Sequence, residues 1–194
     1  IKLPFQTSPL GVFYKGEICV TITFYKTEII ADFVLYSQRK NIEIKDNPDL
    51  VLRLLLSSSV WYLKYLKQVN QKIKLAEDNL EKSIKNEELQ ALLQIEKCLV
   101  FFITSLKAND VLFQRIKNLK AHKADYDSDL LEDVEIELSQ AQDTANIYSN
   151  ILTGMMDAYA SVISNNMNNI MKQMTSISII LMIPTLIASL YGMN

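Results

Sequence analysis

Seven residues near the end of the sequence are spaced to fall on one face of a helix. The intervals between them alternate between three and four residues, which is a heptad spacing. An ordinary heptad seam is apolar, but this one is polar or Met, while Ile and Leu fill the other faces. We call it the polar stripe, and it consists of Asn168, Met171, Thr175, Ser178, Met182, Thr185 and Ser189. Polar groups on an apolar helix face another helix or water. We interpret the stripe as the wall of a narrow pore built from several copies, with close helix packing as the alternative.

The same register continues toward the N-terminus and stays polar. It passes through Ser164, Ser161, Asp157, Gly154 and Asn150. In a bundle of copies, Asp157 would form a ring of carboxylates at the mouth of the pore, as in other cation pathways. The alternative is that Asp157 is an ordinary solvated helix residue.

The helix that carries the stripe is long and apolar enough to cross a membrane. Residues 173–194 contain no charged side chain. As a helix they would extend about 33 Å, against a hydrocarbon core of about 30 Å. Lys172 and the Lys-rich sequence before it favour a cytoplasmic N-terminal side. A buried helix of a soluble protein is the alternative.

Composition excludes several classes of function. The 194 residues include 20 Lys+Arg and 22 Asp+Glu, so no basic excess indicates nucleic acid binding. One histidine and two distant cysteines, Cys19 and Cys98, exclude a multi-histidine or CxxC metal site. Both cysteines are expected to be packing thiols. The sequence has no nucleophile–base pair and no Gly-rich phosphate loop, so we do not expect an enzyme or an organic cofactor.

Two elements are expected at the start of the chain. Residues 18–25 alternate between apolar and polar positions and predict a strand, and residues 28–35 predict a second. Two strands rarely make a stable sheet, so further strands are expected upstream. Because the first residue is Ile1 rather than Met, we treat the sequence as a fragment.

Long helices are expected in the remainder. Asn47 as N-cap and Pro48 in the first turn predict a helix start, and a break near residues 85–86 would turn it into an antiparallel hairpin. Residues 121–128 predict a loop. Asp129 and Glu132 form a capping box that predicts one helix from there to residue 193. It would run 65 residues, or about 95 Å.

These elements predict an α+β chain that is mostly α. Residues 1–45 would be the end of an α/β domain, and residues 46–128 a helical hairpin. Residues 129–172 would form a stalk helix that continues into a membrane helix at residues 173–194.

The last residues, Tyr191-Gly192-Met193-Asn194, resemble the signature that ends the first membrane helix of the CorA family of magnesium and cobalt channels. The Met-Asn-x-x-Met-Lys-x-x-Thr segment and the Ile-Pro-Thr step precede it at ungapped family spacing. The resemblance covers the whole chain. It implies a funnel-shaped homopentamer in the inner (plasma) membrane, with a cytoplasmic N-terminal domain and a second membrane helix in the full-length protein.

The resemblance also implies roles for particular residues. The neutral amide of Asn194 would accept hydrogen bonds from the waters of Mg²⁺, and Gly192 would let the backbone turn there, since glycine tolerates positive φ. Met193 would support this loop. The polar stripe would line the pore, with Met171 and Met182 as hydrophobic constrictions and Met174 in the place of a frequent family leucine. Asp133 falls where the family binds regulatory Mg²⁺ between subunits.

The sequence therefore predicts a passive channel for Mg²⁺, with Co²⁺ and Ni²⁺ as possible cargo, that closes when cytoplasmic Mg²⁺ binds between subunits. The expected partners are further copies of the chain, membrane lipid and divalent cations. A zinc transporter of the same superfamily and a membrane-anchored coiled-coil sensor without transport are the alternatives.

Overall fold

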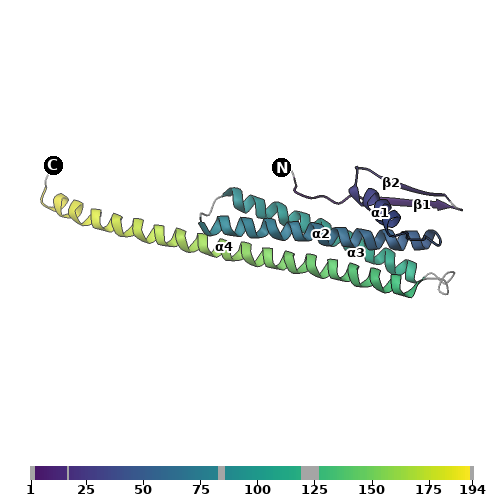
Figure 1. Cartoon of the computed structure of the whole chain (residues 1–194). Coiled ribbons are helices and arrows are strands. Elements are labelled where there is room, and N and C mark those ends of the chain that lie inside the picture. The colour runs from purple at the N-terminus through teal and green to yellow at the C-terminus, as the bar shows by residue number, and fades with distance from the viewer. Residues whose placement is uncertain (1–2, 17, 83–85, 119–126, 193–194) are drawn as a thin grey trace. The chain divides into compact units, whose positions relative to one another are not determined.

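The structure is a computed structural model that describes residues 3–16, 18–82, 86–118 and 127–192 (Figure 1). The elements follow the order β1–β2–α1–α2–α3–α4. The chain divides into two compact units, Ile1–Leu152 and Thr153–Asn194, and each is described by itself. The predicted domain boundaries remain predictions.

The small sheet is an antiparallel hairpin of β1 (Leu10–Lys15) and β2 (Ile18–Thr23). The strand predicted at residues 18–25 is confirmed over most of its length, and β1 is an addition to the prediction. The strand predicted at residues 28–35 is wrong, because these residues begin helix α1 (Glu28–Arg39). The Thr27 hydroxyl caps this helix by accepting a hydrogen bond from Ile29 N. Glu28 lies in the first turn and Arg39 in the last, where their charges interact favourably with the helix dipole.

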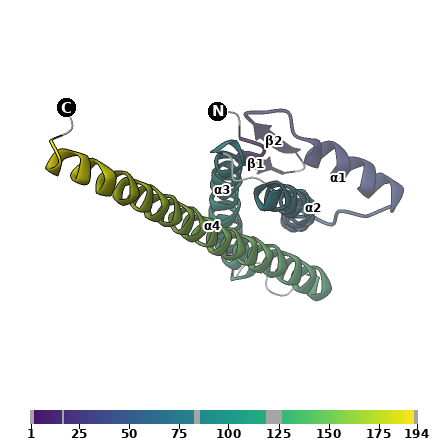
Figure 2. The same ribbon diagram turned by 90° about the vertical axis from the view of Figure 1, so that its left-hand side faces the viewer.

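Helices α2 (Asn47–Lys82) and α3 (Asn86–Lys117) lie side by side and antiparallel, as predicted (Figures 1 and 2). The first turn of α2 contains Pro48, but its N-cap is Asp46 rather than Asn47. The Asp46 carboxylate accepts from Asp49 N at 2.8 Å, and its carbonyl accepts from Leu50 N at 3.1 Å. The core between the helices consists of Leu66, Val69, Ile73, Leu80, Leu92, Ile95, Leu99, Phe102 and Leu106.

Helix α4 (Ser128–Leu190) has 63 residues, so the single long helix is confirmed. Its cap is Asp127 rather than Asp129, since the Asp127 carboxylate accepts from the N–H groups of Asp129 and Leu130. The part of α4 in the first unit packs against the hairpin. Gln142 donates to the Leu106 carbonyl at 3.1 Å, and Lys117 pairs with Glu135 at 2.6 Å. The buried face of α4 consists of Leu130, Val134, Leu138, Ala141, Ala145 and Leu152.

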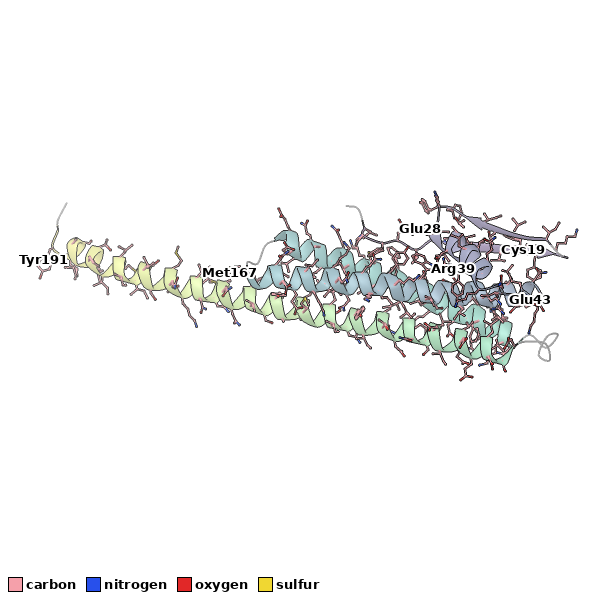
Figure 3. All side chains as sticks on the ribbon, in the orientation of Figure 1. Cys19, Glu28, Arg39, Glu43, Met167 and Tyr191 are labelled. Carbon is pink, nitrogen blue, oxygen red and sulfur yellow. The ribbon has the colours of Figure 1, made fainter. Side chains whose placement is uncertain are left out.

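The second unit is the remainder of α4 and contains Pro184 within the helix. Figure 3 shows side chains projecting above and below it between Met167 and Tyr191. Of the described helices, α3 and α4 are long and apolar enough to cross a membrane. One third of the apolar window of α3 is buried against its neighbours, whereas none of the window of α4 is. Buried residues of α3, such as Leu99 and Phe102, belong to the core of the first unit, whereas no other described residue covers the apolar window of α4.

Candidate ion pathway

All seven residues of the polar stripe lie on α4 within the second unit, and all are exposed there. Met171 and Met182 are 62% and 69% exposed, and Met174 is 62% exposed. Because α4 stays helical from Asn168 to Ser189, the alternating spacing places these residues along one face. The remaining faces expose Ile177, Ile179, Ile180, Leu181, Ile183, Leu186, Ile187 and Leu190. An apolar surface of this kind is stable in lipid and unfavourable in water.

The hydroxyl groups of Thr175, Ser178 and Thr185 on the polar stripe hydrogen-bond to the backbone of the same helix. Thr175 and Ser178 donate to the carbonyls one turn before them, Met171 and Met174, each at 2.8 Å. Thr185 donates to the Met182 carbonyl at 2.8 Å and the Leu181 carbonyl at 3.2 Å. Such bonds satisfy polar groups where water is absent.

Ser176 makes the same kind of bond but was not predicted as a site residue. Its hydroxyl donates to the Lys172 carbonyl at 2.9 Å. It precedes Ser178 by two residues, or about 200° around the helix, so it faces away from the polar stripe.

The C-terminal end of α4 has the expected turn. Gly192 has a φ of +66°, which confirms the positive φ predicted for it. Gly192 N donates to the Ser189 carbonyl at 3.2 Å, and Tyr191 N donates to the Ile187 carbonyl at 3.1 Å. These bonds satisfy two carbonyls of the last turn. Met193 and Asn194, the other two residues of the predicted selectivity motif, lie outside the described residues.

Asp157 belongs to the second unit and its side chain is exposed. The Ser161 hydroxyl donates a hydrogen bond to the backbone carbonyl of Asp157 at 3.0 Å, and not to its carboxylate. Continuous helix between Asp157 and Asn168 keeps both in the register of the polar stripe. A ring of Asp157 carboxylates requires further copies of the chain.

Asp133 lies on the first part of α4 and is exposed. Two acids near it are paired with lysines, since Glu135 contacts Lys117 and Asp127 contacts Lys45 at 3.9 Å. Asp133 forms no ion pair with any residue that the structure describes. Nor do the described residues contain a group of three His, Cys, Asp or Glu side chains that could hold a metal. A Mg²⁺ at Asp133 therefore needs ligands from outside this described part.

Comparison with known proteins gives a consistent family assignment. The family model described as CorA-like Mg²⁺ transporter protein matches residues 3–194. The cobalt/magnesium transport protein CorA of Methanocaldococcus jannaschii is 28% identical over 192 residues, covering 97% of this chain and 61% of the relative. The protein of the same description from Thermotoga maritima is 28% identical over 152 residues, covering 77% of this chain and 43% of the relative.

Solved structures agree with these sequence matches. The complete structure of the CorA magnesium transporter from M. jannaschii has a TM-score of 0.80 at 26% identity, covering 94% of this chain and 59% of that one. The soluble domain of the same transporter has a TM-score of 0.62 at 23% identity, and supports the fold alone. The chain spans about three fifths of the M. jannaschii relative. The match over residues 3–194 establishes that the chain belongs to the CorA-like Mg²⁺ transporter protein family.

Proposed function

We propose that the chain forms the regulatory and pore-lining part of a channel that carries Mg²⁺ passively across the plasma membrane. Co²⁺ and Ni²⁺ are further candidate cargo. The observation that carries the proposal is the polar stripe on an otherwise apolar, uncovered span, in a chain of this family. A helix that is surrounded only by lipid is most stable with apolar residues on every face, whereas a helix beside water is stabilised by a polar stripe.

The proposed assembly is a homopentamer with the polar stripes facing a central axis. One helix cannot enclose a pore, so several copies must contribute α4. Their Ile and Leu faces would then meet lipid or a second membrane helix. The first unit would be cytoplasmic, because Lys172 lies at its side of the span.

Mg²⁺ would pass with most of its water attached, because it gives up water reluctantly and carboxylate ligands inside the pore would hold it too tightly. Gly192, Met193 and Asn194 would form the entrance, where five amide oxygens accept from the water shell. The other end would hold a ring of Asp157 carboxylates that raises the local cation concentration. Met171, Met174 and Met182 would form apolar constrictions that close by losing water.

Regulation would come from Mg²⁺ bound between subunits through Asp133. The exposed and unpaired state of Asp133 within the described residues fits a carboxylate that takes its partner from a neighbouring copy. Bound Mg²⁺ would hold the copies in a symmetric, closed arrangement. When the ions leave, like charges face each other and favour the open state.

The test is Mg²⁺ entry into liposomes that contain the complete protein, with no proton gradient. We expect entry down the Mg²⁺ gradient that stops when Mg²⁺ is high on the cytoplasmic side. Entry of Zn²⁺ alone, and only with a proton gradient, would indicate a zinc transporter. No movement of any divalent ion would favour a membrane-anchored sensor.

A further inference from the structure

Helix α3 carries apolar side chains on two opposite faces. One face holds Leu99 and Phe102 in the core of the first unit. The other face occupies about 120° of the helix surface on the side away from the core. We call it the α3 stripe, and it consists of Leu93, Val100, Phe101, Val111 and Leu112. More than two fifths of each of these residues is exposed, so the described part of the chain leaves the stripe without a cover.

The first part of α4 also has a second apolar face. Leu138 and Ala145 are buried, and the opposite side of the helix exposes three isoleucines. We call them the isoleucine stripe, and they are Ile136, Ile147 and Ile151. Exposed apolar stripes on two helices of one bundle are unfavourable in water and indicate surfaces that pack against something else.

The two stripes share a spacing. Val100 and Val111 are eleven residues apart in α3, and Ile136 and Ile147 are eleven residues apart in α4. Eleven residues make about three full turns, so each pair lies on one line along its helix. All four residues are 53% or 54% exposed. Two such helices can therefore pack with both pairs in contact at once.

The two stripes also lie at the same height along the bundle. The bond from Gln142 to the Leu106 carbonyl marks a common level of α3 and α4, which run antiparallel. At about 1.5 Å per residue, Val100 and Ile147 lie about 9 Å and 7.5 Å from this level toward one end of the bundle. The other valine and isoleucine lie about 7.5 Å and 9 Å from it toward the opposite end. Each valine is thus within about 2 Å of an isoleucine in height.

Opposite charges accompany the two stripes at this level. Lys107 lies at the edge of the α3 stripe, one residue after Leu106, and Asp143 lies beside the isoleucine stripe, one residue after Gln142. Their heights differ by about 3 Å, which the length of a lysine side chain easily spans. Both residues are exposed, and neither forms an ion pair with another residue in the described ranges.

We propose that the α3 stripe of one copy packs against the isoleucine stripe of α4 in the next copy. This inference rests on the proposed function, which requires a ring of copies. In a closed ring of more than two copies, each interface joins two different faces of the chain. Rotation about an axis that runs along the helices changes no height, so faces that meet must already be level. The two stripes meet this condition, and Lys107 of one copy would pair with Asp143 of the next.

Disulfide trapping in the complete protein tests which faces meet. Two differently tagged forms are expressed together in liposomes, one with Val111→Cys and one with Ile136→Cys, and both with Cys19→Ser. We expect mild oxidation to join differently tagged chains at least about tenfold faster than chains with the same tag, because a disulfide needs Cα atoms within about 7 Å. The control replaces Val111→Cys with Leu75→Cys, an exposed apolar position on α2, and should give no mixed disulfide.

Three results would overturn the inference. Disulfides between two Ile136→Cys chains alone would mean that copies meet through α4 only. No disulfide from Val111→Cys would mean that another part of the complete chain covers the α3 stripe. Equal trapping of Leu75→Cys would mean that the disulfides form by random collision. Mg²⁺ entry measured with the same wild-type protein separates the two proposals, because trapping without Mg²⁺ entry contradicts the proposed function and leaves the interface, whereas entry without trapping contradicts the interface alone.

A charge exchange tests the proposed ion pair. Lys107→Glu and Asp143→Lys each place like charges at every interface, so each should raise the concentration at which half of the detergent-solubilised assembly dissociates by about threefold or more. The double variant restores opposite charges and should return to within about twofold of wild type. A double variant that dissociates at least as readily as either single variant would contradict the pairing of these two faces.

Discussion

At the scale of single residues, the two cysteines differ sharply in environment. Cys98 is fully buried and its thiol contacts the Phe5 carbonyl at 3.1 Å, and burial raises the pKa of this thiol. Cys19 is partly exposed on β2. Because the thiolate is the reactive species, we expect maleimide to modify Cys98 at least about tenfold more slowly than Cys19 at neutral pH. Peptide mapping by mass spectrometry measures both rates in one sample, and equal rates would contradict the packing of Phe5 over Cys98.

The start of α2 supplies a second prediction at this scale. Asp46→Ala removes the acceptor for Asp49 N and should destabilise the fold by about 1 kcal/mol. Asp46→Asn keeps a good cap and should have little effect. Trp61, the only tryptophan, lies in α2 and reports its unfolding by fluorescence. Equal loss in both variants would mean that the charge, rather than the cap, matters.

These residue-level details limit what sequence can predict. Asp46 and Asn47 are both good caps, as are Asp127 and Asp129, and the sequence predicted the second of each pair. The choice depends on which residue's carbonyl accepts the first backbone hydrogen bond of the helix, and the two candidates of each pair lie only one or two positions apart. The polar stripe, in contrast, needs only an uninterrupted helix, so its common face could be predicted without any tertiary contact. Hydroxyl orientation toward the backbone is a rotamer property that spacing does not encode.

At the scale of elements, the hairpin should weaken in alkali. Tyr62 on α2 packs edge-to-face on Phe102 of α3, with ring centroids 5.3 Å apart. Burial raises the pKa of Tyr62 above 10.0, and a hydrogen bond with Ser105 offsets this in part. The folded state therefore disfavours the phenolate. The neutral Tyr62 side chain makes its full contribution to stability below the unfolded pKa of about 10. This contribution is lost as pH rises through the folded pKa.

Replacing Tyr62 isolates this contribution. We expect Tyr62→Phe to lose less stability than wild type between about pH 9 and pH 11, because Phe has no proton to lose. The measurement is the denaturant midpoint of Trp61 fluorescence at each pH. Parallel curves for wild type and variant would show that the Tyr62 ring escapes to water when it ionises.

The helices were predicted correctly where apolar residues recur with a single helical spacing. The prediction failed where the pattern of apolar residues fits both a strand and a helix. Residues 48–82 and 128–190 contain few helix breakers and repeat apolar residues every three or four positions, so α2 and α4 were predictable. Residues 28–35 are a short apolar run that suits a strand or a helix equally. The cap formed by Thr27 and the burial of Phe33 favour the helix, α1, over a strand. Ile18 and Ile22 on β2 are exposed in the structure. The alternation of apolar and polar residues predicts the strand but does not predict whether its apolar face is buried.

At the scale of the whole molecule, we predict that the complete protein assembles from five copies. A stripe on one helix becomes a pathway only when several copies surround an axis, and the family resemblance implies five. Native mass spectrometry of the detergent-solubilised protein counts the copies directly. A monomer or dimer as the largest species would contradict the proposal, because neither can enclose a pore.

The proposed closure by cytoplasmic Mg²⁺ would join the two units in function. Asp133 lies in the first unit and the polar stripe in the second. In wild type we expect high Mg²⁺ on the cytoplasmic side to slow entry about tenfold. Asp133→Asn removes a carboxylate from the proposed intersubunit site, so the slowing should fall below about twofold while entry at low Mg²⁺ is unchanged.

Glu132→Gln is the matched control for this prediction. It removes one negative charge from the adjacent position, which points about 100° away around α4 and which is also exposed. If closure depends on a ligand at one position, Glu132→Gln closes like wild type. If it depends on total negative charge near the start of α4, both variants lose closure to the same extent. Closure that survives in Asp133→Asn would move the regulatory site elsewhere and leave the pore assignment intact, because Mg²⁺ entry itself is measured in the same liposomes.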